Sequence, residues 1–182
     1  MGTTGTLEKD INLQIARKLK DDLEEQGMEA ILTRDADENL ADEGASSIKV
    51  SDLKNRVAMI DQADSVLVVS IHQNSYTDSS VSGAQVFYYG QSEEGERLAQ
   101  AIQENLIQTL DPSNTREAKA NDSYYMLKRT SVPTVIVECG FLSNPDEEAL
   151  LQEEEYQDKI VEAIRKGIRA YLENNDGDAE AA

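Results

Sequence analysis

The sequence has little of several features that mark particular classes of protein. It holds one cysteine among 182 residues, which excludes an internal disulfide and a cysteine-rich zinc knuckle. Basic residues are so few that the formal net charge is −19. That charge argues against nucleic acid as a partner, because phosphate contacts need clustered Lys and Arg. No apolar run approaches membrane-spanning length, and these absences together predict a globular protein with an acidic, solvated surface.

The two ends of the sequence help to define the expected limits of the domain. Residues 1–8 have neither the basic start nor the apolar stretch of a signal peptide, so no export signal is expected in the chain as written. A length of 182 residues predicts a single domain. We place that domain at residues 1–173 and expect the small, acidic segment 174–182 to be a disordered tail.

Hydrophobic periodicity predicts alternating helices and strands along the domain. Helices are expected over 7–26, 51–62, 93–110 and 154–172, and strands over 29–33, 66–75, 83–89 and around Glu138. Thr6 and Ser51 are the expected N-caps of the first two helices, and Gly27 follows the first helix. The polar residues 34–47 read as a loop. This alternation predicts an α/β fold, with a mostly parallel twisted sheet flanked by helices on both faces.

Two of the expected strands end in side chains that can do chemistry. His72, which is the only histidine, closes an apolar run, and polar residues surround it. A histidine in this position can be a structural hydrogen-bonding residue or a metal ligand. Because ligands of parallel sheets bind at the carboxyl ends of the strands, His72 is a candidate site residue.

Glu138 interrupts the second of these strands, which is apolar enough to be buried on both faces. A buried carboxylate without a partner has a raised pKa, and a raised pKa suits a general acid or base. The alternatives are that Glu138 emerges into solvent or that it pairs with a basic residue such as Arg129. The residues alone leave these readings open.

Two further residues have competing interpretations. Glu8 lies in the first turn of the first helix, where the helix dipole favours a carboxylate for structural reasons alone. Cys139 together with His72 suggests a cysteine hydrolase. Adjacent strand residues point to opposite faces, however, so Cys139 and Glu138 are not expected to share one site.

Several segments, in this order, resemble the zinc-dependent N-acetylmuramoyl-L-alanine amidases of the amidase-3 type. They are Gly5-Thr-Leu-Glu-Lys-Asp-Ile-Asn-Leu13, Leu32-Thr-Arg34, Arg56-Val57, Ser70-Ile-His-Gln-Asn74 and Val137-Glu-Cys-Gly-Phe-Leu-Ser-Asn144. The resemblance extends from about residue 5 to residue 172. Within the family, Gly83-Ala-Gln-Val-Phe87 and Leu40-Ala-Asp42 look most like the spore-cortex subgroup that forms muramic δ-lactam.

The resemblance implies a function and a role for each candidate. The enzyme would hydrolyse the amide between N-acetylmuramic acid and the L-alanine of the peptidoglycan stem peptide. Glu8 and His72 would be zinc ligands, and Glu138 the catalytic residue that transfers the proton. Zn²⁺ is the implied cofactor, peptidoglycan the implied partner and the cell envelope, outside the cytoplasm, the implied location; whether a protein activator takes part is left open.

One feature of the resemblance is missing. In the family, a further zinc histidine follows the first strand, upstream of the glutamate ligand, whereas this sequence has one histidine and begins with the first helix. We therefore expect that the chain lacks that first strand and is impaired, because a catalytic zinc normally has three protein ligands. The alternative is a peptidoglycan-binding or regulatory domain without activity, built on the amidase scaffold; a cysteine hydrolase that uses Cys139 is the third hypothesis.

Overall fold

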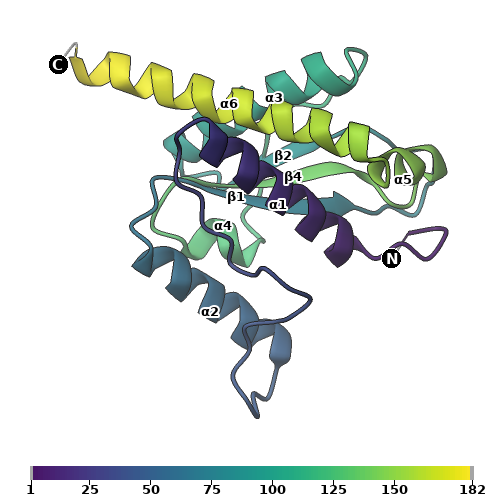
Figure 1. The fold of residues 1–182 in the computed structure, drawn as a ribbon, viewed down its shortest axis with the longest axis horizontal. Helices are drawn as coiled ribbons and strands as arrows, with labels where there is room; N and C mark the ends of the chain where they lie inside the picture. The colour runs from purple at the N-terminus through teal and green to yellow at the C-terminus, as the bar shows by residue number, and fades with distance from the viewer. Residues whose placement is uncertain (1, 181–182) are drawn as a thin grey trace.

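The computed structural model describes residues 2–180, with side chains described as far as residue 174. Figure 1 shows one sheet between two layers of helices. The strands lie in the order β1 (Val68–Asn74), β4 (Thr134–Phe141), β2 (Gln85–Tyr88) and β3 (Lys119–Ala120). The pairs β1–β4 and β2–β3 are parallel, and β4–β2 is antiparallel. The predicted α/β fold with a mostly parallel sheet is confirmed.

Helices cover both faces of the sheet, as expected. One face carries α1 (Glu8–Glu25), α3 (Glu93–Leu110) and α6 (Glu154–Glu180), and the other carries α4 (Tyr125–Arg129) with α2 (Ile48–Gln62) packed beyond it (Figure 1). The short helix α5 (Pro145–Leu151) follows β4. Neither α5 nor β3 was predicted. No helix in residues 2–180 is long and apolar enough to cross a membrane.

The main core lies on the face covered by α1, α3 and α6. Alternate residues of β4, among them Val135 and Val137, have no exposed surface and point into this core. The apolar row predicted for α1 contributes Ile11 and Ile15, which are buried against β1. This continuous apolar layer fixes the position of α1, whose first residue is Glu8.

Two predicted N-caps are wrong. Leu7, not Thr6, precedes α1, and no side chain caps that helix. Ser47 caps α2 by accepting a hydrogen bond from Val50 N, whereas Ser51 lies inside the helix. The Ser51 hydroxyl instead donates to Asp42 Oδ2 at 2.9 Å, which ties the preceding loop to α2. The contact of Ser51 with the loop is a tertiary interaction that the local sequence pattern does not reveal.

The strand predicted at residues 29–33 is also wrong. This segment has no regular secondary structure, and Ile31 is 56% exposed. A strand needs a neighbouring strand for its backbone hydrogen bonds. Within residues 2–180, β1 pairs only with β4, so its other edge has no strand partner and the segment 29–33 does not join the sheet.

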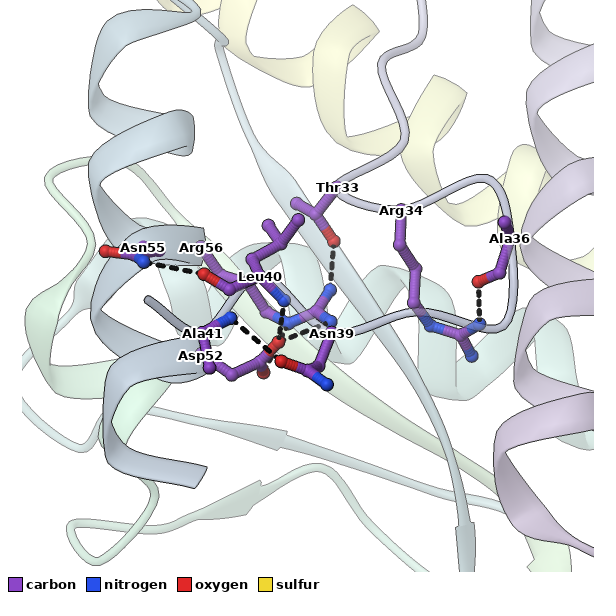
Figure 2. Close-up of polar contacts among 9 residues, drawn as sticks. All are labelled: Thr33, Arg34, Ala36, Asn39, Leu40, Ala41, Asp52, Asn55 and Arg56. Atoms are coloured by element: carbon purple, nitrogen blue, oxygen red, sulfur yellow. Dashed lines mark hydrogen bonds and ion pairs between the residues drawn. The ribbon is translucent and has the colours of Figure 1, made fainter. Parts of the chain in front are cut away.

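The predicted loop of residues 34–47 is confirmed as irregular, but it is held in place by α2 (Figure 2). Arg56 Nε and Nη2 donate to the two carboxylate oxygens of Asp52, at 2.8 and 3.0 Å. Asp52 Oδ1 also accepts from Leu40 N, and Arg56 Nη1 donates to Thr33 Oγ1. Arg34 Nη2 donates to the backbone oxygen of Lys9, so the same loop contacts the first turn of α1.

The last helix is longer than predicted. The prediction ended it at residue 172, whereas α6 continues to Glu180 in the structure. Tyr171 is the last buried residue described in this helix, and Leu172 packs partly against the same core. The disorder expected for 174–182 stays a prediction.

Candidate functional site

A row of polar side chains crosses the face of the sheet that α2 and α4 cover. His72 of β1 lies opposite Glu138 of β4 in the parallel pair, and Glu138 lies opposite Gln85 of β2 in the antiparallel pair. Residues that are opposite one another in neighbouring strands point to the same face. The pairing of His72 with Glu138 near the carboxyl ends of two parallel strands confirms that these two predicted site residues come together.

Glu8 joins the row from the first turn of α1. Its Oε1 lies 2.9 Å from Nδ1 of His72 and also accepts from Asn12 Nδ2 at 3.2 Å and from Gln73 N at 3.3 Å. Burial raises the pKa of Glu8, but the hydrogen bonds and the charge of His72 outweigh burial and leave the pKa lowered. Glu8 is therefore an anion held beside the imidazole.

Glu138 is the buried carboxylate that the sequence suggested. It is 7% exposed, and its Oε2 atom is buried with no hydrogen-bond partner among the residues described. Its pKa is raised from 4.5 to about 7, mainly by burial; His72 opposes the rise, and the negative charge of Glu8 adds to it. The alternative partner Arg129 is wrong: its guanidinium lies over the ring of Tyr125, and no ion pair with Glu138 occurs within residues 2–180. Glu138 is thus poised to gain or lose a proton near neutral pH.

Tyr124 is a site residue that the sequence analysis missed. Burial, followed by the negative charge of the nearby Glu138 carboxylate, raises the pKa of its hydroxyl, and the hydroxyl in turn lowers the pKa of Glu138. The ring packs edge-on against Phe87, with ring centroids 5.9 Å apart. In the sequence, Tyr124 stood in a short apolar stretch, and no spacing rule links it to a glutamate on another element. Only the packing of α4 on the sheet shows the contact.

Cys139 points away from this site. It has no exposed surface and belongs to the core under α1, α3 and α6. Burial strongly raises the pKa of its thiol, so the nucleophilic thiolate is disfavoured. The structure therefore supports the expectation that Cys139 and Glu138 do not share a site, and the cysteine-hydrolase hypothesis has no geometric support.

The donor set can be compared with what zinc requires. A carboxylate oxygen and an imidazole nitrogen are donors that zinc accepts, and in Glu8 and His72 they converge, with side chains 37% and 43% exposed. A catalytic zinc normally has three protein ligands, however. Nowhere in residues 2–180 do three or more His, Cys, Asp or Glu side chains gather closely enough to hold a metal. The residues therefore fit part of a zinc site.

The arrangement of a proton-exchanging carboxylate beside a carboxylate–imidazole pair is typical of hydrolases. The sequence profile of one family, described as N-acetylmuramoyl-L-alanine amidase, matches residues 1–170. The chain belongs to this amidase family. The profile covers all three candidate residues, Glu8, His72 and Glu138.

Individual amidases are similar over almost the whole chain. A germination-specific N-acetylmuramoyl-L-alanine amidase of Bacillus subtilis is 42% identical over 169 residues, which are 91% of this chain and 71% of the relative. The solved structure of the CwlD amidase from Clostridioides difficile, in complex with the GerS lipoprotein, has a TM-score of 0.91 and 40% identity over 95% of this chain and 90% of that one. The amidase AmiC2 of Nostoc punctiforme has a TM-score of 0.80 and 33% identity over 94% and 88%.

These similarities confirm the family predicted from the sequence motifs and extend to the fold. The amidase domain keeps the sheet and its helices even though residues 29–33 form no strand. The resemblance to the spore-cortex subgroup agrees in kind with the germination-specific relative.

Proposed function

We propose that this amidase domain hydrolyses the amide between the lactyl group of N-acetylmuramic acid and the L-alanine of the stem peptide in peptidoglycan. The observation that carries the proposal is Glu138: a buried carboxylate with a pKa raised to about 7, next to Glu8 and His72 at the carboxyl ends of the strands. Family membership supplies the substrate class, because the matched family and its relatives are amidases of this type.

Glu138 carries the proton in this mechanism. As a base it accepts a proton from the attacking water, and as an acid it delivers that proton to the amine of L-alanine as the amide bond breaks. Its pKa near 7 suits both directions at neutral pH. Its Oε2 atom, which has no hydrogen-bond partner in the described part of the chain, is free to make these contacts.

Zinc is the proposed cofactor, with Glu8 Oε1 and His72 Nδ1 as donors from this chain. The chemistry that bound zinc supplies is polarisation of the scissile carbonyl and acidification of a water molecule. Asn12 and Gln73 orient the Glu8 carboxylate through hydrogen bonds, and such supporting contacts strengthen metal sites. With two donors instead of three, we expect the 182-residue polypeptide to hold zinc weakly and to be impaired as an enzyme.

The biological setting is proposed from the relatives. The germination-specific relative supports a role in spore-cortex peptidoglycan, and the complex of the similar CwlD amidase with a lipoprotein supports a protein partner. Peptidoglycan lies outside the cytoplasm, so we propose the cell envelope as the location.

The activity is tested by incubating the protein with purified cortex peptidoglycan and excess zinc, and then by measuring new L-alanine amino termini by mass spectrometry. Release of stem peptides that begin with L-alanine is the expected result, and Glu138→Gln is the inactive control. Release of sugar fragments without new alanine termini contradicts an amidase.

Zinc binding is tested separately by elemental analysis after dialysis. We expect much less than one zinc per chain, and a further loss in His72→Ala. One tightly bound zinc per chain would contradict the proposal that the donor set is incomplete.

The two-donor set also favours a second function, a peptidoglycan-binding domain without turnover. In that case the protein sediments with insoluble peptidoglycan but releases no alanine termini at any zinc concentration. Against this function, a binding domain has no use for a buried carboxylate with a pKa near 7.

A further inference from the structure

A single arginine, Arg116, stands at the end of the polar row that contains Glu138. Its Nη1 atom donates to Gln85 Oε1 at 3.3 Å, and Gln85 lies directly opposite Glu138 in the sheet. Its Cζ atom lies 4.9 Å from the centre of the Phe141 ring, three residues beyond Glu138 on β4. The register between β1 and β4 shifts just after Glu138, so Phe141 pairs with Asn74 next to the site. The guanidinium therefore lies at the β2 end of the polar row, in contact with the residue that pairs with Glu138.

The surrounding chain is built to hold this side chain. Arg116 Nε donates to Ser82 O at 2.8 Å, and Arg116 N donates to Asn114 Oδ1 at 3.0 Å. Gly83 has φ of 100° and leaves room for both residues, since a Cβ there would lie 2.8 Å from Asn114 Oδ1 and 3.3 Å from Arg116 Nε. Two segments that are distant from Arg116 in sequence, residues 82–85 and the end of β4, thus fix the guanidinium, which lowers the entropy that binding a ligand would cost.

Among the described residues, the Arg116 guanidinium forms no ion pair with a carboxylate. The chain has 36 acidic and 17 basic residues, yet none of the ion pairs found in the described residues includes Arg116. Burial raises the pKa of the Glu147 carboxyl, and the charge of nearby Arg116 offsets only part of that rise. The oxygens of Glu147, however, already accept hydrogen bonds from Gly83 N at 2.9 Å and Phe141 N at 2.8 Å. The groups that contact the guanidinium directly are thus neutral: a backbone oxygen, an amide oxygen and an aromatic ring.

We propose that Arg116 binds a free carboxylate of the stem peptide and so selects anionic muramoyl peptides as ligands. A guanidinium matches a carboxylate in shape and charge. The amine of L-alanine forms the scissile amide, so the stem peptide extends from L-alanine away from the bond that is cleaved. The acidic residue that follows L-alanine is therefore expected to reach the end of the polar row, where Arg116 lies. This inference rests on the proposed amidase function and adds a specificity-determining residue to it.

The test compares two ligands that differ only in charge. They are N-acetylmuramoyl-L-alanyl-D-glutamate with both carboxyl groups free and the same molecule with both carboxyl groups as amides. Binding is measured by calorimetry with a chelator present, so that no metal can bind the carboxylates. We expect the protein to bind the acid about tenfold more tightly than the amide. Equal affinity for the two ligands overturns the inference.

Three variants locate the effect. Arg116→Gln is expected to bring the two affinities within about twofold of each other, whereas Arg116→Lys keeps part of the preference because it keeps the charge. Arg129→Gln is the matched control: it removes the same charge from an arginine that also lies over an aromatic ring, and the preference should remain. Thermal unfolding checks that each variant is folded.

Each remaining outcome decides the proposal. If the preference for the acid over the amide survives in Arg116→Gln, or if Arg129→Gln loses it as fully as Arg116→Gln does, then the preference comes from the overall charge of the protein. Either result overturns the inference. If neither ligand binds the unmodified protein, the inference is overturned, and the hydrolysis assay with excess zinc decides the proposed function separately. Release of alanine termini from peptidoglycan with equal affinity for acid and amide would leave the proposed function standing and remove Arg116 from it.

Discussion

The two faces of the sheet differ in what they contribute to the molecule, although the same strands form both. On β4, Val137 and Cys139 point into the apolar core under α1, α3 and α6, whereas Glu138 between them points to the face under α4 and lies in the polar row. The apolar face packs against the helices, and the other face carries the candidate site residues. Neighbouring residues therefore differ in what their substitution should change: stability on one face, and activity on the other.

The largest expected effect is on the polar face. Glu138→Gln removes the group that transfers the proton while keeping the shape of the side chain. We expect the rate of alanine-terminus release, with zinc in excess, to fall at least about 100-fold. Turnover within about twofold of the unmodified protein would remove Glu138 from the mechanism.

Cys139→Ala is the matched control on the neighbouring residue. It removes a fully buried sulfur atom from the core, so we expect the free energy of unfolding to fall by about 1–2 kcal/mol. The hydrolysis rate of the folded variant should be unchanged, and a large loss of rate would revive the cysteine-hydrolase hypothesis. Urea unfolding and the alanine-terminus assay measure the two effects.

A substitution at the contact between α3 and α6 is a second way to destabilise the packing on the apolar face. A Cβ at Gly167 would lie 2.5 Å from the backbone Cα of Ile102, and a backbone atom cannot move aside cheaply. Replacing glycine by alanine within a helix ordinarily stabilises by up to about 1 kcal/mol, but this clash is expected to cost about 2–3 kcal/mol. Gly167→Ala should therefore lower stability in urea unfolding. Lys166→Ala, at a neighbouring position with a half-exposed side chain, should change it by less than about 0.5 kcal/mol.

The pH dependence of the free energy of unfolding tests the polar face without an activity assay. The pKa of Glu138 is raised from 4.5 to about 7 in the folded protein. The unfolded chain therefore loses this proton first, and folding becomes less favourable as the pH rises towards 7. Relative to the unmodified protein, Glu138→Gln should gain about 2 kcal/mol between pH 5.5 and pH 8.5, measured by urea unfolding with a chelator present. A stability difference that is the same at both pH values would contradict the raised pKa.

The smallest expected effect comes from Tyr124. Its hydroxyl lowers the pKa of Glu138, so Tyr124→Phe should raise that pKa further. The acidic limb of the pH profile of hydrolysis should then move to higher pH, and the rate at neutral pH should fall by less than about tenfold. Tyr125→Phe, on the next residue, should leave the profile in place. A shift in the opposite direction would mean that the hydroxyl does not stabilise the carboxylate.

The sequence predicted the site better than it predicted the edges of the fold. Periodic apolar residues correctly located α1 and α3, because a helix that covers a core must repeat its apolar side chains. Glu138 and His72 could be recognised because a polar residue at the end of an apolar strand requires an explanation. The segment 29–33 has the composition of a strand, but composition cannot reveal whether a partner edge is available.

What the sequence determined by itself is the alternation of helices and strands, the family motifs and the chemical nature of Glu8, His72 and Glu138. These depend on local periodicity and on which side chains are present. Only the tertiary structure decided that Tyr124 lies near Glu138, that Cys139 rather than Glu138 faces the core and that Arg116 lies at the end of the polar row without an ion pair among the described residues. The physical reason is that these relations depend on strand register and helix packing between distant segments, which no local pattern encodes.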